Sequence, residues 1–345
     1  MEGRNLVSWP AILGTLALVV LGLLAWELRW VLLVLFGAVV LAVALDVPVQ
    51  VLMRRTPLHR PQALVVVVGL LVLLGWELGF LLLPELVQQV ATLNELLPQL
   101  LQRVGAFLSE IRGVGPLGSS LESSGGLSAL QPLGSQLLGL AGGAANSSIQ
   151  VLLMALLALL LCLEPPHHVN LLIAATPRFY RPQGRRLLQQ CRDALGGWLA
   201  GMTISAISVF LLTWAGLAWL QVPLALLSGL VCGLLTFVPT IGPTVATLLP
   251  TALALVVSPE LSLKVIVLRL ILQNGEAFLL TPLLLSRTVN LLPTVALMAQ
   301  LSLGALLGLP GVLLALPLVV VLQVLLQEVF VKEIMDRWTL KSSNG

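Results

Sequence analysis

The sequence predicts an all-α, polytopic membrane protein with about eight transmembrane segments, two of which are interrupted by proline and glycine. Hydrophobic residues make up 58% of the 345 residues, charged residues make up 10%, and the mean hydropathy is +1.04. A soluble domain of this size needs more charge on its surface. The composition and the recurring apolar stretches therefore predict helices that span a membrane.

Five uninterrupted apolar stretches come first, each long enough for the roughly 20-residue helix that crosses a bilayer. They are residues 9–26, 30–46, 61–84, 147–164 and 196–220. A second apolar stretch follows the first almost at once, so we expect residues 9–26 to be a first span and not a cleaved signal peptide.

The first interrupted stretch covers residues 223–257 and contains the segment Phe237-Val238-Pro239-Thr240-Ile241-Gly242-Pro243. Proline lacks an amide donor, and the backbone groups that it frees are costly in hydrocarbon unless they face protein or a water-filled cavity. We therefore predict two half-helices whose junction lines a pathway. The residues expected there are Pro239, Thr240, Gly242, Pro243 and Thr244. The two threonine hydroxyls fit either ligand contacts or helix caps, and the stretch either crosses the membrane once or turns back.

The second interrupted stretch covers residues 293–330 and is too long for a single span. Gly308, Pro310 and Gly311 offer a break near its middle. The prolines recur with similar spacing in both interrupted stretches, which indicates a weak internal repeat. Paired interrupted segments indicate the binding region of a transporter, although kinked packing helices produce the same pattern.

Between these stretches, residues 262–282 carry an acidic residue, Glu276, at membrane depth. A carboxylate at the centre of a membrane helix costs about 2.5 to 3.5 kcal/mol, so it is expected to face the protein interior. Helical periodicity places Arg269 and Gln273 on the same face, with Asn274 beside it. Glu276 could carry a proton, bind a cation or accept hydrogen bonds from a polyol, with Gln273 and Asn274 adding contacts. The alternative is a structural ion pair with Arg269 or Arg287.

Basic residues in the loops predict the orientation of the chain. They follow the second span (Arg54, Arg55, Arg60) and the fourth span (Arg178, Arg181, Arg185, Arg186, Arg192). Positively charged loops stay in the cytoplasm, so we expect both termini there. The predicted organisation is three membrane helices in residues 1–84, an extracytoplasmic amphipathic helix and Gly/Ser-rich loop in 85–146, and a transport core in 147–345 with a basic cytoplasmic loop at 165–195.

The predicted outside segment begins with apolar residues that alternate in steps of four and three. They are Leu86, Val90, Leu93, Leu97, Leu100, Val104, Phe107 and Ile111. This spacing indicates an amphipathic helix. It packs on its own domain, on another helix or subunit, or on the bilayer surface.

The sequence gives no support to several other classes of function. It has no HExxH, GxSxG or Walker A motif and no glycine-rich dinucleotide loop, so we expect neither an enzyme nor a cofactor. The adjacent His167 and His168 lack a second ligand pair, so no metal site is expected. A net charge of +3 does not favour nucleic acid as a partner.

Three spaced motifs resemble those of the AI-2E family of bacterial transporters. The segment from Phe237 to Pro243 is similar to the family's signature around Pro-x-x-Gly-Pro. Gln273, Glu276 and Pro282 are similar to its Gln-x-x-Glu pattern with a later proline. The ending from Gly308 to Gly311, followed by Leu316-Pro317, is similar to its closing motif. Phe278 and Leu292 depart from the family, which often has Asn and His at these positions.

The resemblance implies a multi-pass, oligomeric secondary transporter of the bacterial inner membrane, driven by an ion gradient. Family members are linked to export of the quorum-sensing signal autoinducer-2, so the implied solute is a small polar organic molecule of that kind. Members are also associated with Na+(Li+)/H+ exchange, which is the first alternative. A non-transporting membrane scaffold or channel is the second. The expected partners are the lipid bilayer, the solute or a monovalent cation or proton, and further copies of the chain.

Overall fold

The computed structural model describes residues 9–110, 144–238, 241–280 and 292–328, and the regular elements in these ranges are helical. In chain order they are α1 (Trp9–Glu27), α2 (Arg29–Arg55), α3 (Arg60–Glu110), α6 (Ala144–Leu163), α7 (Pro165–Ala174), the 3-10 turn η1 (Arg178–Tyr180), α8 (Arg181–Trp219), α9 (Ala225–Leu235), α10 (Ile241–Val257), α11 (Pro259–Gly275), the π-helical turn η2 (Glu276–Leu280) and α13 (Pro293–Leu325). The all-helical class predicted from the sequence is confirmed.

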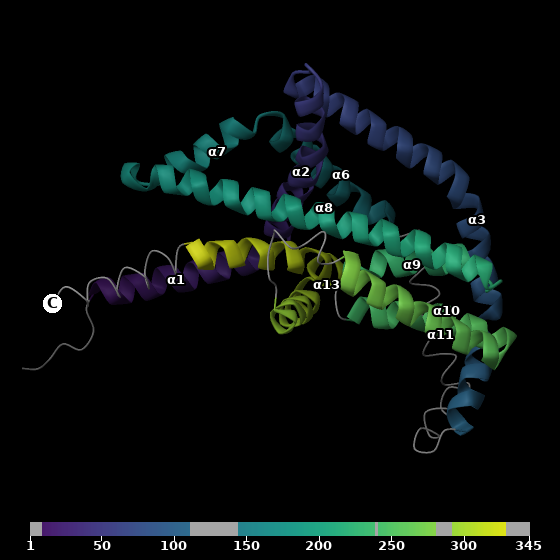
Figure 1. The fold of residues 1–345 in the computed structure, drawn as a ribbon. Helices are drawn as coiled ribbons and strands as arrows, with labels where there is room; N and C mark the ends of the chain where they lie inside the picture. The colour runs from purple at the N-terminus through teal and green to yellow at the C-terminus, as the bar shows by residue number, and fades with distance from the viewer. Residues whose placement is uncertain (1–8, 111–143, 239–240, 281–291, 329–345) are drawn as a thin grey trace, which may run out of the picture.

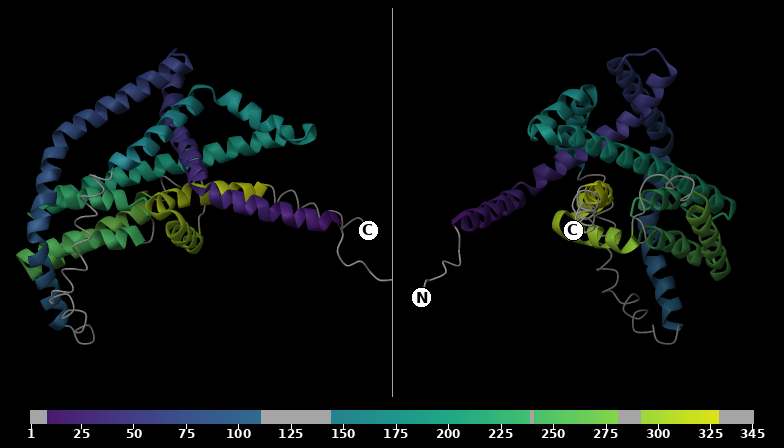
Figure 2. Two further views of the ribbon diagram at one scale, coloured as in Figure 1. Left: turned by 180° about the vertical axis from the view of Figure 1, so that it is seen from behind. Right: turned by 60° about the vertical axis from the view of Figure 1, so that its left-hand side comes forward.

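Helix α8 crosses the centre of the molecule (Figure 1). It contacts α2, α7, α9, α11 and α13. In the view of Figure 1, α2, α6 and α7 lie above α8, whereas α10, α11 and α13 lie below it, and α3 arches down one side. Helix α1 projects away from the rest of the molecule (Figure 2). Helix α8 is therefore the central helix, and the helices that contact it are packed around it.

Four helical segments are long and apolar enough to cross a membrane. They are Arg29–Arg55, Arg60–Leu93, Arg178–Trp219 and Pro310–Glu328. A fifth span results if α6 and α7, which meet at an angle of 88°, are counted as one bent crossing. Helices α9 and α10 are shorter. The described helices thus confirm a polytopic membrane protein, while the expected count of about eight segments is not confirmed.

The outward faces of these helices are strongly apolar. On α3, for example, Trp76, Phe80 and Leu81 are 75%, 78% and 71% exposed. Only 11% of its most apolar 18-residue window is buried inside the protein. Large apolar side chains remain exposed in this way when the surrounding solvent is lipid, so α3 presents most of its spanning part to the bilayer.

A buried carboxylate, Asp46 on α2, joins four helices. It accepts hydrogen bonds from Arg60 at the start of α3 (2.5 Å), from Nε of Arg192 on α8 (2.8 Å) and from Gln50 one turn along α2 (2.8 Å). Nε of Arg60 also donates to the carbonyl of Cys162 near the end of α6 (2.9 Å). Because Arg60 and Arg192 come from the two basic loops predicted from the sequence, these loops meet at one point. We call this group the Asp46 centre.

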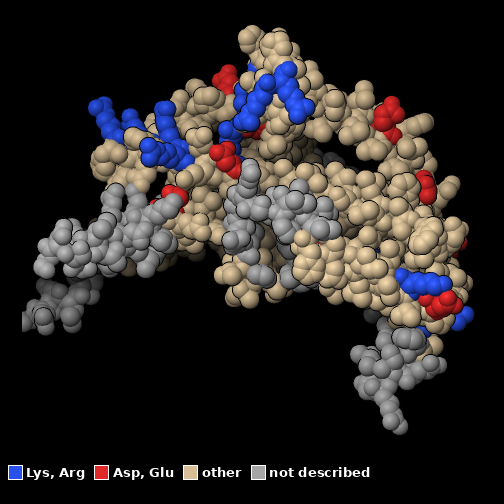
Figure 3. Space-filling model, in the orientation of Figure 1, with Lys and Arg blue, Asp and Glu red and all other residues tan. Residues whose placement is uncertain are grey.

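Charged residues are distributed unevenly over the surface. Most Lys and Arg side chains visible in Figure 3 gather at the upper end, over α7 and the α2–α3 junction, and most of the rest of this face is uncharged. This distribution agrees with the Asp46 centre, which ties the same two regions together.

Helices α9 and α10 form an antiparallel pair, hairpin A. The thiol of Cys232 on α9 donates to the carbonyl of Ala246 on α10 (3.3 Å). Leu227 near the start of α9 shares an apolar cluster with Leu253 near the end of α10. The first interrupted stretch therefore turns back and does not continue as one helix.

Hairpin A is closed at its tip by Gly242. A Cβ atom added there would lie 1.9 Å from the carbonyl oxygen of Leu235 on the other helix. The amide of Gly242 donates to the carbonyl of Val238 (2.8 Å), and the amide of Val238 donates to the carbonyl of Leu235 (3.0 Å). The break in the helix therefore leaves these backbone groups paired, as an apolar environment requires.

Helix α3 holds the base of hairpin A. The side-chain oxygen of Gln89 accepts a hydrogen bond from the amide of Leu227 (2.8 Å), which supplies a partner for the first turn of α9. Members of the predicted amphipathic seam pack on the same base: Leu86, Val90, Leu93 and Leu100 join the cluster that contains Leu227 and Leu253. This part of the seam thus packs on its own chain. The predicted boundary at residues 84 and 85 lies inside α3, whereas the Gly/Ser-rich loop and Ile111 lie outside the described residues.

The two halves of α13 meet at a kink at Gly308 and lie at a large angle to each other (Figures 1 and 2). Gly308 has φ 65° and ψ −150°, a conformation that is essentially restricted to glycine. Beyond the kink, a Cβ atom on Gly311 would lie 2.1 Å from the carbonyl oxygen of Leu303. Ala296, at the start of α13, shares a cluster with Leu316 in the second half. In both interrupted stretches the chain therefore changes direction at a break where a glycine packs closely on the other half.

We predict that Gly242→Ala destabilises the protein, because the new methyl group would collide with backbone and not with a flexible side chain. Overpacking of this kind costs about 1 to 3 kcal/mol or more. The measurement is the thermal midpoint of the purified protein in detergent. Gly75→Ala is the matched control, since no atom lies within 4 Å of a Cβ at that position of α3. Equal midpoints for the two variants would contradict the close contact at the tip.

We predict that Asp46→Asn lowers stability by roughly 3 kcal/mol, the lower end of the cost of breaking a buried ion pair. The lower end applies because the Arg192 side chain is 37% exposed. The same thermal assay checks this value. Glu260→Gln is the control, because Glu260 pairs with Lys264 (2.7 Å) on the surface of α11, where its side chain is 77% exposed. That variant is expected to leave the midpoint unchanged.

Candidate functional site

Two hydrogen bonds, which together we call the ladder, join α8 to α11 and η2. The bond made by Glu276 is the acidic rung, and the bond made by Arg269 is the basic rung. Oγ of Ser205 donates to Oε1 of Glu276 (2.5 Å), and Nη1 of Arg269 donates to Oγ1 of Thr213 (2.8 Å). The hydroxyl residues are eight positions apart on α8 and the charged residues are seven apart, which corresponds to about 12 Å and about 10.5 Å of helix. Because their order is reversed, the two helices run antiparallel and their polar positions match.

The acidic rung lies at a change of helical form. Glu276 is half-buried and is the first residue of the π-helical turn η2, directly after α11. Ser205 is 8% exposed. Single π-helical turns occur frequently at functional sites. A carboxylate that meets a buried hydroxyl at such a turn provides an oxygen-rich position in which a proton or a cation can be bound.

The basic rung extends into hairpin A. Arg269 is only 3% exposed, and its Nε also lies 3.4 Å from Oγ1 of Thr247 on α10. The Thr247 hydroxyl in turn donates to the carbonyl of Pro243 (2.8 Å). Both described hydrogen bonds of Arg269 therefore go to threonine hydroxyls, and the second connects the guanidinium group to a residue predicted to lie at the helix break.

The tip of hairpin A lies against α8 beside the acidic rung. A Cβ atom on Gly233 would lie 2.9 Å from the carbonyl oxygen of Ala206, the residue after Ser205. Phe237, at the tip, packs on a cluster that includes Met202 of α8 and Ala296 of α13. The site is therefore bounded by α8, η2, hairpin A and the start of α13.

The structure brings together part of the predicted pathway. Gly242 is buried, Pro243 is linked to Arg269 through Thr247, and Gln273 is half-buried one turn before Glu276. Asn274 is exposed and donates to the carbonyl of Leu270 in its own helix (2.7 Å). Thr244 is also exposed. Pro239, Thr240, Pro282 and Arg287 lie outside the described residues.

The predicted break in α13 is present and lies at Gly308. Gly308 and Pro310 are exposed, and Gly311 is buried against the first half of α13. The first half of α13 reaches the site through Ala296, which belongs to the same apolar cluster as Met202 and Phe237.

Sequence reasoning missed Ser205, Thr213 and Asp46. The signal for the first two was their spacing: two hydroxyl residues eight positions apart in an apolar helix match two charged residues seven positions apart. Asp46 was hidden because it falls at the end of an apparent span, where a carboxylate needs no explanation. Its role follows only from the tertiary contact with Arg60 and Arg192.

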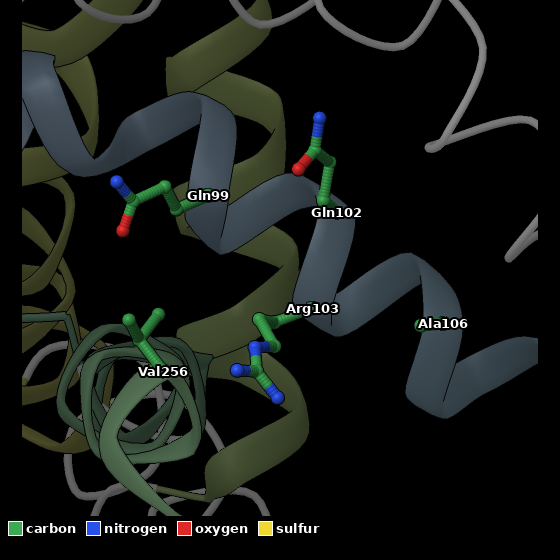
Figure 4. A pocket seen from close by; sticks show the side chains of 5 residues that line it. All are labelled: Gln99, Gln102, Arg103, Ala106 and Val256. Carbon is green, nitrogen blue, oxygen red and sulfur yellow. The ribbon is translucent and has the colours of Figure 1, made fainter.

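Two cavities lie away from the ladder. One of about 650 Å³ lies between α3 and the end of α10 and is lined by Gln99, Gln102, Arg103, Ala106 and Val256. Figure 4 shows Arg103 extending toward α10, whereas Gln102 points to the other side of α3. The other, of about 240 Å³, adjoins the Asp46 centre. The described residues contain no group of three His, Cys, Asp or Glu side chains that could hold a metal ion.

Known proteins are similar to the chain over most of its length. The sequence profile described as "AI-2E family transporter" matches residues 14–330. The AI-2 transport protein TqsA of Escherichia coli (strain K12) is 29% identical over 302 residues, which cover 84% of this chain and 84% of TqsA. YrrI of Bacillus subtilis (strain 168) is 28% identical over 151 residues, or 44% of this chain and 43% of YrrI. The chain thus matches less than half the length of YrrI.

We predict that Thr213→Val destabilises the protein by about 1 to 3 kcal/mol, because it leaves a buried guanidinium donor without its acceptor. Thr203→Val is the matched control on the same helix, since Thr203 is exposed and its hydroxyl bonds the carbonyl of Leu199 in its own helix. The comparison uses thermal midpoints in detergent. A loss no larger than that of the control would show that the basic rung does not stabilise the fold.

Proposed function

Because the chain belongs to the AI-2E family of transporters, its role is membrane transport, and we propose that it is a secondary transporter that exports a small polar organic solute. An autoinducer-2-like signal is the proposed solute, since the relative TqsA is named for AI-2 transport. The proposed driving force is an ion gradient. The observation that carries the proposal is the hydrogen bond between Ser205 and Glu276 beside the tip of hairpin A.

This hydrogen bond provides a route from ion binding to helix movement. When ionised, the Glu276 carboxylate accepts the hydroxyl proton of Ser205, and the two helices are held together. When a proton or a cation neutralises the carboxylate, this charge-assisted bond weakens. Loading and release of the ion would then change how firmly α8 holds η2, and hairpin A lies against the same part of α8.

The proposed pathway contains the predicted positions near this bond. Gly242 and Pro243 belong to the tip of hairpin A, and Gln273 precedes Glu276 by one turn. Pro239, Thr240 and Pro282 remain in the proposal on sequence grounds alone, as do Thr244, Asn274, Gly308, Pro310 and Gly311. Arg269 is proposed to keep α8, α10 and α11 in register below the pathway.

A Na+(Li+)/H+ antiporter is the second candidate, and the same observation favours it. A carboxylate oxygen and a serine hydroxyl are hard oxygen ligands of the kind that Na+ and Li+ prefer. If the ion itself is the cargo, Glu276 would exchange it for a proton. The apolar seam of α3 was the reason to consider a scaffold. Seam residues such as Leu86, Val90 and Leu100 pack on hairpin A of the same chain, so the seam does not support that alternative.

We further propose that the protein lies in the bacterial inner membrane with both termini in the cytoplasm. The meeting of the two basic loops at the Asp46 centre supports a common side for them. A homo-oligomer is proposed as well. Its support is the apolar outer face of helices such as α1, where Leu13 and Leu23 are 61% and 65% exposed and can face either lipid or another copy.

We predict that Glu276→Gln abolishes gradient-driven flux while leaving expression and oligomer size unchanged. The amide cannot carry the ion, although it keeps the size of the side chain. The measurement is flux in proteoliposomes with an imposed pH gradient, with either an autoinducer-2-type furanone or Na+ supplied. Glu260→Gln, the same change on the exposed part of α11, serves as the control and is expected to transport like the wild type.

The two solutes separate the candidates. Furanone movement that depends on Glu276 supports the exporter, whereas proton movement that needs only Na+ supports the antiporter. Full flux in the Glu276→Gln variant would remove the residue from the mechanism.

A further inference from the structure

A cavity of about 240 Å³ lies between α2 and α8, beside the Asp46 centre. Small residues of α8 line it, because Gly196, Gly197 and Ala200 follow one another at steps of one and three and share one face of the helix. The volume is many times the roughly 10 to 15 Å³ that one buried water needs. The cavity therefore has room for a chemical group of several atoms.

The two helices run antiparallel along the cavity. Asp46 of α2 bonds Nε of Arg192 on α8 (2.8 Å), and one turn further along α8 a Cβ atom on Gly196 would lie 3.5 Å from the side chain of Val43. Residue numbers therefore fall along α2 as they rise along α8. One end of the cavity is apolar, where Val43 faces Ala200, and the other end is polar.

The polar end carries charges of both signs. Arg54 of α2 and Asp193 of α8 line it, and both are exposed. Among the described residues, neither of them makes a hydrogen bond or an ion pair. Arg192 lines the cavity too, and in the Asp46 centre it is one of two arginines that share a single carboxylate, which leaves an excess positive charge. This end of the cavity therefore fits a group that is anionic beside the arginines and cationic beside Asp193.

The polar end also lies at the depth of the lipid headgroups. Helix α2 has 27 residues and is about 40 Å long, whereas the hydrocarbon core of a bilayer is about 30 Å thick. Arg54 belongs to the last turn of this helix, beyond its apolar part. In Figure 3, basic side chains gather at this end of the molecule with a few acidic side chains among them. The apolar end of the cavity then points into the hydrocarbon.

We propose that this cavity binds a phospholipid whose headgroup carries a primary amine, such as phosphatidylethanolamine. The phosphate would contact Arg54 and Arg192, the ammonium group would contact Asp193, and the acyl chains would leave past Val43 and Ala200. Basic pockets between membrane helices bind phospholipid headgroups in this way. The unpaired carboxylate of Asp193 selects the amine, because an ammonium group offers three N–H donors that a choline headgroup lacks.

The lipid site goes beyond the proposed transport function and does not depend on it. It lies at the Asp46 centre, and its residues are separate from the ladder and from hairpin A. A lipid in the cavity would contact both of the helices that Asp46 and Arg192 join. Its binding is therefore expected to stabilise the contact between α2 and α8 and to raise the thermal midpoint of the whole protein.

The test measures lipid binding by the full-length protein, purified in detergent and stripped of lipid. Phosphatidylethanolamine or phosphatidylcholine is added in increasing amounts, and the rise in the thermal midpoint gives an apparent affinity. The wild type is expected to bind phosphatidylethanolamine about tenfold more tightly, because only this headgroup can donate to Asp193. Asp193→Asn is expected to lose this preference. Glu164→Gln, which neutralises an exposed carboxylate before α7, is the control and should keep it.

A second variant tests the phosphate contact. Arg54→Gln is expected to weaken the binding of both lipids about tenfold, because it removes a charge-assisted donor to the phosphate. Arg55→Gln is the matched control: Arg55 is the exposed neighbour of Arg54 and lies outside the lining of the cavity. Both arginines are exposed at the end of α2, so both variants are expected to fold.

Three results would overturn the proposal. The first is equal binding of the two lipids by the wild type. The second is an equal effect of Arg54→Gln and Arg55→Gln. The third is a response to glycerophosphoethanolamine, the headgroup without acyl chains, as large as the response to the lipid, because the ligand would then be a soluble phosphate compound and not a lipid. A preference that disappears in Asp193→Asn, together with weaker binding in Arg54→Gln alone, would support the lipid site.

Discussion

The architecture depends on how the chain pairs its backbone where it breaks two helices inside an apolar environment. Hydrocarbon offers no hydrogen bonds, so a broken helix is stable there only if its ends find partners in the protein. At Gly242 and at Gly311 the absence of a side chain lets one half-helix rest directly on the carbonyl of the other. The amides of Val238 and Gly242 are paired within the turn of hairpin A. These contacts allow the chain to change direction at two places where a single long helix would otherwise continue.

Polar groups inside the protein follow the same constraint and thereby fix the relative positions of the helices. Asp46 binds two arginines from separate loops, and the ladder from Ser205 to Arg269 sets the register of α8 against α11. Each such group has few acceptable partners in this environment. Displacing one helix by a single turn would leave a charged or hydroxyl group unpaired, so the polar contacts specify positions that apolar packing alone would leave loosely defined.

Much of the fold could be predicted from the sequence, because the apolar stretches and the prolines are local signals. The helices, the two interruptions and the inward-facing position of the half-buried Glu276 follow from hydropathy, from backbone chemistry and from the cost of charge in a membrane. The direction of the chain after each break could not be predicted, because it depends on contacts between residues such as Gly311 and Leu303. The partner of Glu276 could not be predicted either, because Ser205 is 71 residues away. An ion pair with Arg269 was a reasonable expectation, but the described bonds of Arg269 go to Thr213 and Thr247.

Helix α3 is continuous from Arg60 to Glu110, with 51 residues and a length of about 75 Å. Its first residue is anchored at the Asp46 centre, and about 60 Å further along, Leu100 is packed against the base of hairpin A. A helix resists stretching, so it acts as a strut that keeps these two anchor points at a nearly constant separation. Any motion of hairpin A relative to the Asp46 centre is therefore confined to an arc, unless α3 bends at Pro84 or Pro98.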